Sequence, residues 1–200
     1  MVKRHIALII FMLLCAATLP PKAQAQPPFI FTAHGGLFFP SKSDFKEQFQ
    51  SASDLIWSIG ACLPAMGKEL QITFDYSNFR SEGIIDPALD SSAHYTERII
   101  HAGILHKRTL TRDMDLRMMA GFNRVSAQEK ISSTRTPEHS LESGYKFGFY
   151  GGLGVEQLFD DPHISIYADV VYDYSRSHDK EFYGDLGGVR IVMGVNIIMF

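Results

Sequence analysis

Residue types that could support catalysis are few in this chain, and they are scattered. His163-Ile164-Ser165 places an imidazole two positions from a hydroxyl. Alternate residues of a β-strand share a face, so this histidine could act as a base for the serine. The pair lies at the short connection DDPH, which ends at His163, so we expect a turn residue followed by an inward-facing serine. The other histidines beside polar residues fall in expected loops, where we expect solvated side chains: His94, His139 with Ser140, and His178 with Asp179.

Metal, phosphate and disulfide chemistry are not indicated either. Asp86, Asp90 and His94 share one expected loop, but their spacing does not match the compact loops that hold hard cations. The glycines of GGLGVE are not followed by a helical pattern, which a phosphate-binding loop requires. Cys62 is the only cysteine beyond the N-terminal segment, which excludes an intrachain disulfide there. We therefore predict no catalytic, metal or cofactor site.

Charged residues instead recur on one phase of alternating segments. In 145–159 and 188–200, large apolar residues alternate with glycines and occasional charges. A water-facing strand would favour Lys, Glu and Thr, because glycine weakens strands. Glycine beside charge is typical of the crowded interior of a small barrel. The predicted charge network of this interior comprises Asp75, Arg117, Lys146, Glu156, Asp169, Asp173 and Arg190.

Enclosed charges are costly unless they are paired or hydrated. Each of these residues, with Glu97 and His101 of the same phase, must therefore pair across the lumen or lie in water at a barrel mouth. We expect the deepest positions to be those of Arg117, Glu156, Asp169 and Arg190. Opposite signs on different strands favour ion pairs that close the lumen, with Arg117 and Arg190 meeting Glu156, Asp169 and Asp173.

Strands crossing a membrane would position these charges. Segments of about ten residues with period-two alternation match the length of a tilted strand that spans a bilayer. The predicted strands are 29–39, 54–63, 69–79, 97–106, 115–125, 145–159, 164–175 and 188–200. Aromatic residues near the strand ends are expected at the membrane interfaces.

The polar connections alternate between long and short. Four connections are long: PSKSDFKEQFQSAS, RSEGIIDPALDSSAHYT, SAQEKISSTRTPEHSLESG and RSHDKEFYGDLG. Three are short: PAMGK, KRTLTRDM and DDPH. Outer-membrane barrels have short periplasmic turns and longer extracellular loops. The chain is therefore predicted to be all-β, as an eight-stranded antiparallel up-and-down transmembrane β-barrel.

The N-terminus is typical of an exported protein. MVKRH is followed by the apolar stretch 6–19 and by Ala23-Gln24-Ala25, the pattern of a signal peptide and its cleavage site. The stretch is shorter than the roughly 20 apolar residues of a spanning helix. We expect residues 1–25 to be removed between Ala25 and Gln26, leaving 26–200 as one barrel domain. A composition of 20% charged and 12% aromatic residues excludes a disordered chain.

Three segments resemble the small outer-membrane barrels of the OmpA/OmpX type and the related outer-membrane β-barrel domain family. They are the opening strand GGLFFPSKSDFK, the hairpin YGGLGVEQLFDDPHISIYADVVYDY and the final strand ending on Phe200. The resemblance covers nearly all of 26–200. In that family a C-terminal aromatic residue is part of the signal read by the barrel-assembly machinery. Phe200 matches it and Ile198 fits its hydrophobic third-from-last position, whereas Asn196 and Gly194 depart from it.

The resemblance implies a location in the outer membrane of a Gram-negative cell, in contact with outer-membrane lipid and lipopolysaccharide. It implies a structural or surface-interaction role in which the long loops contact an extracellular ligand. No basic patch of the sequence indicates nucleic acid. Two alternatives remain: a small diffusion channel, which a normally filled eight-stranded lumen disfavours, and a lipid A-modifying enzyme, for which His163 and Ser165 are the candidates.

Overall fold

The computed structural model describes residues 29–42, 45, 49, 53–66, 69–86, 91–132, 139–159, 163–178 and 183–199. The expected signal peptide, its cleavage site at Ala25 and Gln26, and the terminal Phe200 lie outside these residues. No helix within the described ranges is long and apolar enough to cross a membrane.

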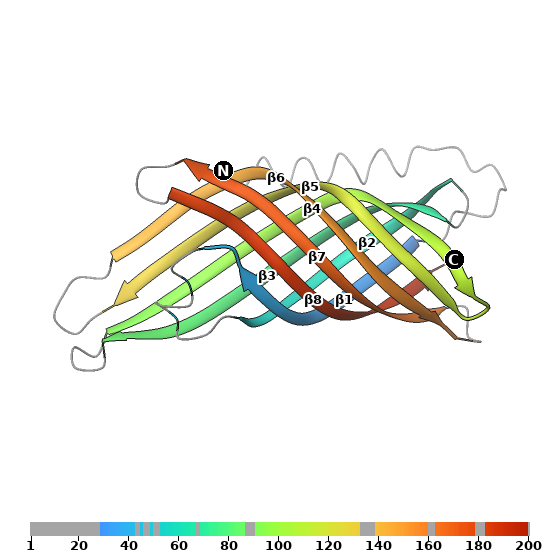
Figure 1. The fold of residues 1–200 in the computed structure, drawn as a ribbon, viewed down its shortest axis with the longest axis horizontal. Coiled ribbons are helices and arrows are strands. Elements are labelled where there is room, and N and C mark those ends of the chain that lie inside the picture. Colours follow the sequence, from blue (N-terminus) through green and yellow to red (C-terminus); the bar gives the residue numbers. More distant parts are fainter. Residues whose placement is uncertain are drawn as a thin grey trace.

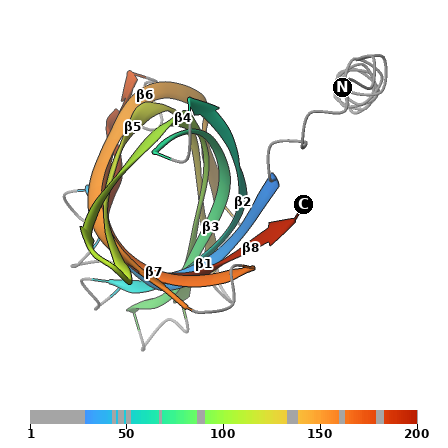
Figure 2. The same ribbon diagram turned by 90° about the vertical axis from the view of Figure 1, so that its right-hand side faces the viewer.

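Eight strands form one closed barrel in which each strand is antiparallel to the next and β1 pairs with β8 (Figures 1 and 2). The predicted up-and-down topology is confirmed. The strands are β1 (Phe29–Pro40), β2 (Asp54–Met66), β3 (Leu70–Asp86), β4 (Ser91–Thr111), β5 (Met114–Ser132), β6 (His139–Leu158), β7 (Ile164–His178) and β8 (Tyr183–Met199).

The two ends of the barrel differ in their connections. One end carries the short links β2–β3, β4–β5 and β6–β7, together with the start of β1 and the end of β8, and we name it the turn end. It lies on the right in Figure 1. The opposite end, the loop end, carries the links that follow β1, β3, β5 and β7. The connections predicted to be long therefore lie together at one end and those predicted to be short at the other, but the predicted difference in length holds only in part. The strands extend into the loop end, so the β3–β4 and β7–β8 links span only 87–90 and 179–182, no longer than the β6–β7 link 159–163.

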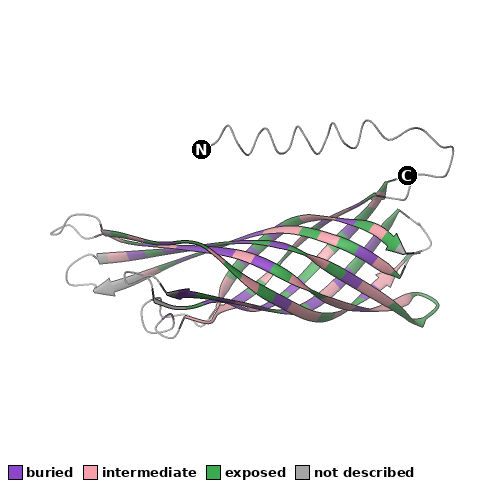
Figure 3. Ribbon diagram, turned by 90° about the horizontal axis from the view of Figure 1, so that it is seen from above, coloured by how far each residue is buried: buried purple, intermediate pink, exposed green. Residues whose placement is uncertain are grey.

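Strands β3 to β6 run well beyond their predicted limits at the loop end. β3 continues to Asp86, β4 begins at Ser91, and β5 continues to Ser132. β7 likewise continues to His178 and β8 begins at Tyr183, so much of three predicted long loops is strand. The ladder persists there, with Arg80 opposite Thr96. We name residues 80–86, 91–98, 126–132 and 139–144 the extended wall (left in Figure 3). The prediction was wrong because outward residues of the wall are polar, which removes the apolar alternation but not the backbone pairing.

The outward phase is apolar along the middle of the barrel, and the inward phase is buried (Figure 3). Phe149 is 54% exposed and Val195 is 39% exposed, whereas inward Arg190 is 3% exposed. The apolar belt also includes Leu55, Trp57, Phe74, Ile104, Phe122, Phe147, Leu153, Val170 and Met193. Such a surface matches lipid, and the predicted phase is confirmed.

Strand tilt follows from the register. Paired residues traced once around the barrel from Ile30 return to β1 at Pro40, a shear of ten residues. With a rise of about 3.3 Å per residue and strands about 4.8 Å apart, this shear corresponds to a tilt of about 40°. Because the strands are tilted, inward residues on strands that are two or three apart can lie at the same height along the barrel axis and can meet inside the lumen.

Candidate functional site in the lumen

Near the turn end, Arg117 of β5 lies between two carboxylates. Its Nε and Nη2 donate to the two oxygens of Asp169 at 2.9 and 3.2 Å, and its Nη1 donates to Oε2 of Glu156 at 2.9 Å. A bidentate guanidinium–carboxylate pair is among the stronger hydrogen-bonded arrangements in proteins. Lys107 adds a second cation, 2.7 Å from the same Glu156 oxygen.

The second oxygen of Glu156 is also occupied. It accepts hydrogen bonds from the Ser165 hydroxyl and, at 2.8 Å, from the Asn196 amide. We name Lys107, Arg117, Glu156, Ser165, Asp169 and Asn196 the turn-end cluster. The hydroxyl proton of Ser165 is directed to a buried carboxylate, so this serine serves the cluster. His163 is an exposed turn residue, as expected for the non-catalytic interpretation.

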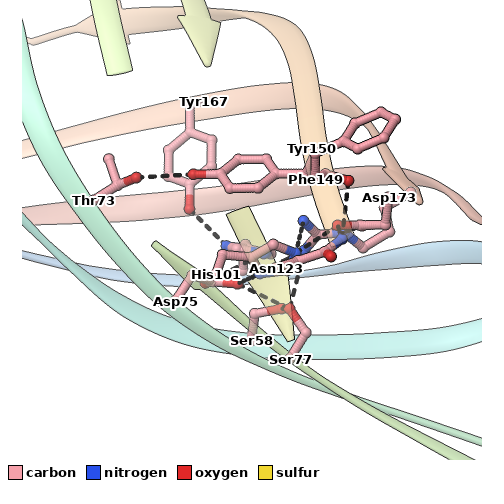
Figure 4. Close-up of polar contacts among 12 residues, drawn as sticks. Ser58, Thr73, Asp75, Ser77, His101, Asn123, Phe149, Tyr150, Tyr167 and Asp173 are labelled. Atoms are coloured by element: carbon pink, nitrogen blue, oxygen red, sulfur yellow. Dashed lines mark hydrogen bonds and ion pairs between the residues drawn. The ribbon is translucent and has the colours of Figure 1, made fainter. Parts of the chain in front are cut away.

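Closer to the loop end, Arg190 of β8 and His101 of β4 share Asp173. Arg190 Nε donates to one oxygen of Asp173 at 2.7 Å, and His101 Nε2 lies 2.6 Å from the other. His101 Nδ1 is 3.1 Å from Asp75, so both ring nitrogens face carboxylates. Ser58, Ser77 and Asn123 complete this central cluster by hydrogen bonds (Figure 4).

Tyr167 and His34 join the two clusters. The guanidinium carbon of Arg117 lies 4.0 Å from the centroid of the Tyr167 ring, a cation–π distance. The Tyr167 hydroxyl is 2.9 Å from His34 Nδ1, and His34 Nε2 is 3.8 Å from Asp75. A cavity of about 60 Å³ lies between the clusters, lined in part by these four residues. Polar contacts thus run continuously through the lumen within the apolar belt.

At the loop end, aromatic rings fill the lumen. The Phe45 and Phe49 rings stack at 4.6 Å, and Phe45 also meets the rings of Tyr95 at 5.4 Å and Phe79 at 5.9 Å. Phe38 packs on Phe79 at 4.8 Å. We name these five residues the aromatic plug. Each is at most 3% exposed, so the mouth is closed by apolar packing.

Two polar contacts hold the plug at its margins. Lys42 forms an ion pair with Glu129 of β5 and lies 5.7 Å from the Tyr95 ring centroid. Glu97 is fully buried and accepts hydrogen bonds at 2.7 Å from the Tyr95 hydroxyl and from the Gly187 amide. The Lys42–Glu129 ion pair therefore connects the segment after β1 to β5 in the extended wall.

Glycines on the inward phase make room for the clusters. A β-carbon at position 154 would lie 1.9 Å from an oxygen of Asp169, and one at position 194 would lie 2.5 Å from the Tyr167 ring. Gly154 and Gly194 therefore allow the Arg117–Asp169 pair and the Tyr167 ring to approach the barrel wall. This agrees with the crowded lumen expected from the sequence.

The structure brings together all of the predicted network residues except Lys146. The two arginines meet Glu156, Asp169 and Asp173 as predicted, and the structure divides these partners between them. Arg117 pairs with Glu156 and Asp169, whereas Arg190 pairs with Asp173 and also with Asp75. Lys146 keeps the inward phase opposite Val125 but is partly exposed and lies outside both clusters as we define them.

Sequence reasoning missed several contributors. Lys107 fell in a predicted turn, and the neutral partners Ser77, Asn123 and Asn196 carry no charge signal. Phe45 and Phe49 fell in a predicted loop, although their spacing of four residues in a polar stretch is the amphipathic signal that could have identified them. Their partners are distant in sequence, so only the fold shows what they contact.

The remaining histidine, aspartate and cysteine candidates of the sequence are only partly described by the structure. Among the described residues, no group of three or more His, Cys, Asp or Glu side chains could hold a metal ion. His94 is exposed, 3.4 Å from Glu82, while Asp90, Asp179 and the side chains of Asp86, His139 and His178 lie outside the description. Ser140 is exposed on β6. Cys62 is a buried free thiol.

Comparisons with known proteins identify the fold. No family model matches the chain, and no curated protein matches it. Similar solved structures include a major outer membrane protein of Thermus thermophilus, with 10% identity, a TM-score of 0.60 and coverage of 88% of this chain and 100% of that one.

Two further structures have comparable scores. Neisserial surface protein A is 13% identical with a TM-score of 0.53 and covers 85% of this chain and 96% of its own. The attachment invasion locus protein Ail of Yersinia pestis, in complex with the heparin analogue sucrose octasulfate, is 12% identical with a TM-score of 0.53 and covers 86% and 100%. The fold is thus that of small outer-membrane β-barrels.

Proposed function

We propose that this chain is a non-enzymatic, non-conducting barrel of the outer membrane that presents its loop end at the cell surface as an interaction site. The observation that carries the proposal is the double closure of the lumen. The turn-end and central clusters fill it with buried ion pairs, and the aromatic plug fills it again above them. A lumen filled in this way supports a structural or presenting role rather than transport.

The shape of the loop end supports presentation. The strands of the extended wall are 17 to 21 residues long, whereas β1 has 12 residues, and about 10 residues suffice to cross a bilayer. Short turns gather at the opposite end, which in outer-membrane barrels is the periplasmic one. The wall would then project from the cell. Similar structures named as a surface protein and an attachment protein accord with such a role through their fold.

Two measurements test the proposal. The refolded full chain in a planar bilayer should give no stable conductance, whereas steady open channels would favour the diffusion-channel alternative. An epitope inserted after Ser133 or after Ala88 should label intact cells, whereas one between Met66 and Gly67 should label only permeabilised cells. Labelling of the Met66–Gly67 insertion alone would invert the topology.

A lipid A-modifying activity is the alternative of a different class. It would appear as a mass change in lipid A from cells that express the chain, compared with cells that do not. The engagement of Ser165 by Glu156 and Asn196 leads us to expect no change. If lipid A does change in mass, and this change disappears in a Ser165→Ala variant, the non-enzymatic proposal is wrong.

A further inference from the structure

Three arginines follow one another across the outer face of the extended wall and its base. Arg80 on β3 is opposite Thr96, and Arg98, two residues along β4, is its diagonal neighbour. Arg98 is opposite Ser126, and Arg124, two residues along β5, is diagonal to it in turn. Diagonal neighbours on one face of a sheet lie about 7–8 Å apart, within reach of long side chains. We name Arg80, Arg98 and Arg124 the arginine arc.

The arc is nearly level. With a shear of ten residues over eight strands, positions of equal height shift by about 1.25 residues per strand toward the turn end from β3 to β5. Each arginine of the arc is displaced by two residues in that same direction. The remaining difference is under one residue per strand, so the three Cα atoms lie within about 4 Å in height.

The arc stands at one edge of the apolar belt. On the outward phase of β4, Ile100, Ala102 and Ile104 separate Arg98 from His106 and Arg108. Ten residues of strand tilted by about 40° span about 25 Å in height, and the apolar band of membrane barrels is about 25 Å tall. Arg98 and Arg108 therefore mark the two faces of the hydrocarbon layer, and the arc lies where lipid headgroups begin.

The positive charge of the arginine arc is not neutralised by ion pairs with neighbouring carboxylates of the described residues, so it is available to an anion. Within the described part of the chain, Arg80, Arg98 and Arg124 have no carboxylate within ion-pair distance, and Glu82 faces His94 instead. On the opposite wall, Arg176 is balanced by Asp185 at 3.8 Å. The chain as a whole has a net charge of −3, so the arc is a local positive feature of an acidic protein.

A groove continues upward from the arc. It has a volume of about 270 Å³, and its lining includes Arg80, Arg98 and Lys130, polar groups of His94, Thr96 and Gln128, and one carboxylate, that of Glu82, which lies 3.4 Å from His94. At the lower edge, the Arg124 guanidinium lies 4.1 Å from the Tyr145 ring centroid and 5.6 Å from that of Phe147. The surface thus changes upward from apolar side chains to arginine and then to mixed polar groups.

We propose that the arginine arc and this groove bind the headgroup of a phosphorylated glycolipid in the adjoining leaflet. Acyl chains would lie on the apolar belt, phosphates would meet the guanidinium groups, and sugar hydroxyls would face the polar groove. Arginine suits this position because its planar fork matches phosphate oxygens in a bidentate way. The proposal rests on the outward orientation of the loop end, because a glycolipid of this kind belongs to the outer leaflet.

The test compares two matched double variants of the full chain, refolded in phosphatidylcholine nanodiscs. R80Q/R98Q removes two arginines of the arc, and R108Q/R112Q removes two exposed arginines near the turn end. Titration with bisphosphorylated lipid A, read by native mass spectrometry, should show about a 25-fold loss of affinity for R80Q/R98Q, at about fivefold per arginine. R108Q/R112Q should bind as the unaltered chain does, and dephosphorylated lipid A should bind the unaltered chain as weakly as R80Q/R98Q binds the phosphorylated form.

Several results would overturn the proposal. They are equal affinities of the two double variants, equal binding of dephosphorylated lipid A, and displacement of lipid A by inorganic phosphate or a soluble polysulfated sugar at equal concentration, which would make the arc a site for soluble anions. R80K/R98K retains charge and should recover part of the affinity, and heat-modifiable gel mobility verifies that each variant folds. Conductance and epitope labelling are measured separately, so failure of the closed-barrel proposal or of its topology is recognised independently of lipid binding.

Discussion

At the loop end of this barrel, apolar rings fill the lumen and polar side chains face outward, as in a water-soluble protein. In the belt region the arrangement is reversed, with polar side chains in the lumen and apolar ones outside. Along β4, inward Tyr95 and Ile99 are apolar while outward His94 and Arg98 are polar. A few residues further on, inward His101 is polar while outward Ile104 is apolar. One continuous strand therefore exchanges the roles of its two faces where the membrane begins.

This exchange shows which force closes each half of the lumen. In water, packing of the plug rings is favoured by the hydrophobic effect. Within lipid, an apolar interior gains no comparable advantage, because the acyl chains are as apolar as the side chains. The belt region is closed instead by paired charges, whose stability depends on the presence of every partner. Substitutions in the two regions should therefore separate these two modes of closure.

The largest effect is expected in the central cluster. Arg190→Met leaves Asp173 and Asp75 without their arginine, and an unpaired buried charge costs about 3–5 kcal/mol. Urea unfolding in lipid vesicles should show that loss. The R190M/D173N double variant should recover much of it, because it removes charges of both signs. If R190M alone unfolds at the same urea concentration as the unaltered chain, the central cluster is not dry and closed.

The plug should respond to loss of volume rather than of charge. Phe79→Ala removes a ring that is fully buried against Phe38 and Phe45, and such changes cost about 3–5 kcal/mol where the site cannot collapse. We expect the lower part of this range, because the plug lies at one end of the barrel, where neighbouring rings can shift into the space. Hydrogen exchange should accelerate in 91–98 and 126–132 but not in the belt. Equal acceleration in both regions would mean that the two closures unfold as one unit.

A charge introduced at an outward position should be costly in the belt and tolerated in the extended wall. Val195→Arg places a charge on the lipid face and should cost about 2–4 kcal/mol if the position is near the midplane. Thr96→Arg, on the same phase but in the extended wall, should change stability by less than about 0.5 kcal/mol. Both are read as the free energy of unfolding in vesicles. Similar costs for the two variants would mean that the exchange of faces does not mark the membrane boundary.

The same contrast explains what the sequence could and could not predict. Within the belt, outward residues are uniformly apolar, so period-two alternation located all eight strands. In the extended wall the faces exchange and the apolar residues, such as Tyr95, point inward, so apolar outward alternation is missing and the sequence predicts a loop there. Ion-pair partners depend on the stagger of the barrel. In the register of β7 and β8, Arg190 is opposite Val171 and Asp173 is opposite Gly188, which makes Arg190 and Asp173 diagonal neighbours. The sequence alone does not specify this register.

The smallest expected effect tests whether the two closures are independent. Lys42→Met removes the cation that pairs with Glu129 and that stands beside the Tyr95 ring, at the partly exposed margin of the plug. Exposed pairs contribute about 0.2–1 kcal/mol, and because Glu129 is only 4% exposed, we expect a loss at the top of that range or somewhat above it, still below the effect of Arg190→Met. Hydrogen exchange at the loop end should nevertheless increase, because this ion pair connects the segment after β1 to β5.

Conductance of the Lys42→Met variant should stay absent, since the turn-end and central clusters still fill the lumen below the plug. Glu129→Gln, which keeps the shape of the side chain, should reproduce the faster exchange if the ion pair is the cause. Stable channel openings in the Lys42→Met variant would show that the plug alone seals the barrel and that the ion-pair clusters beneath it are permeable.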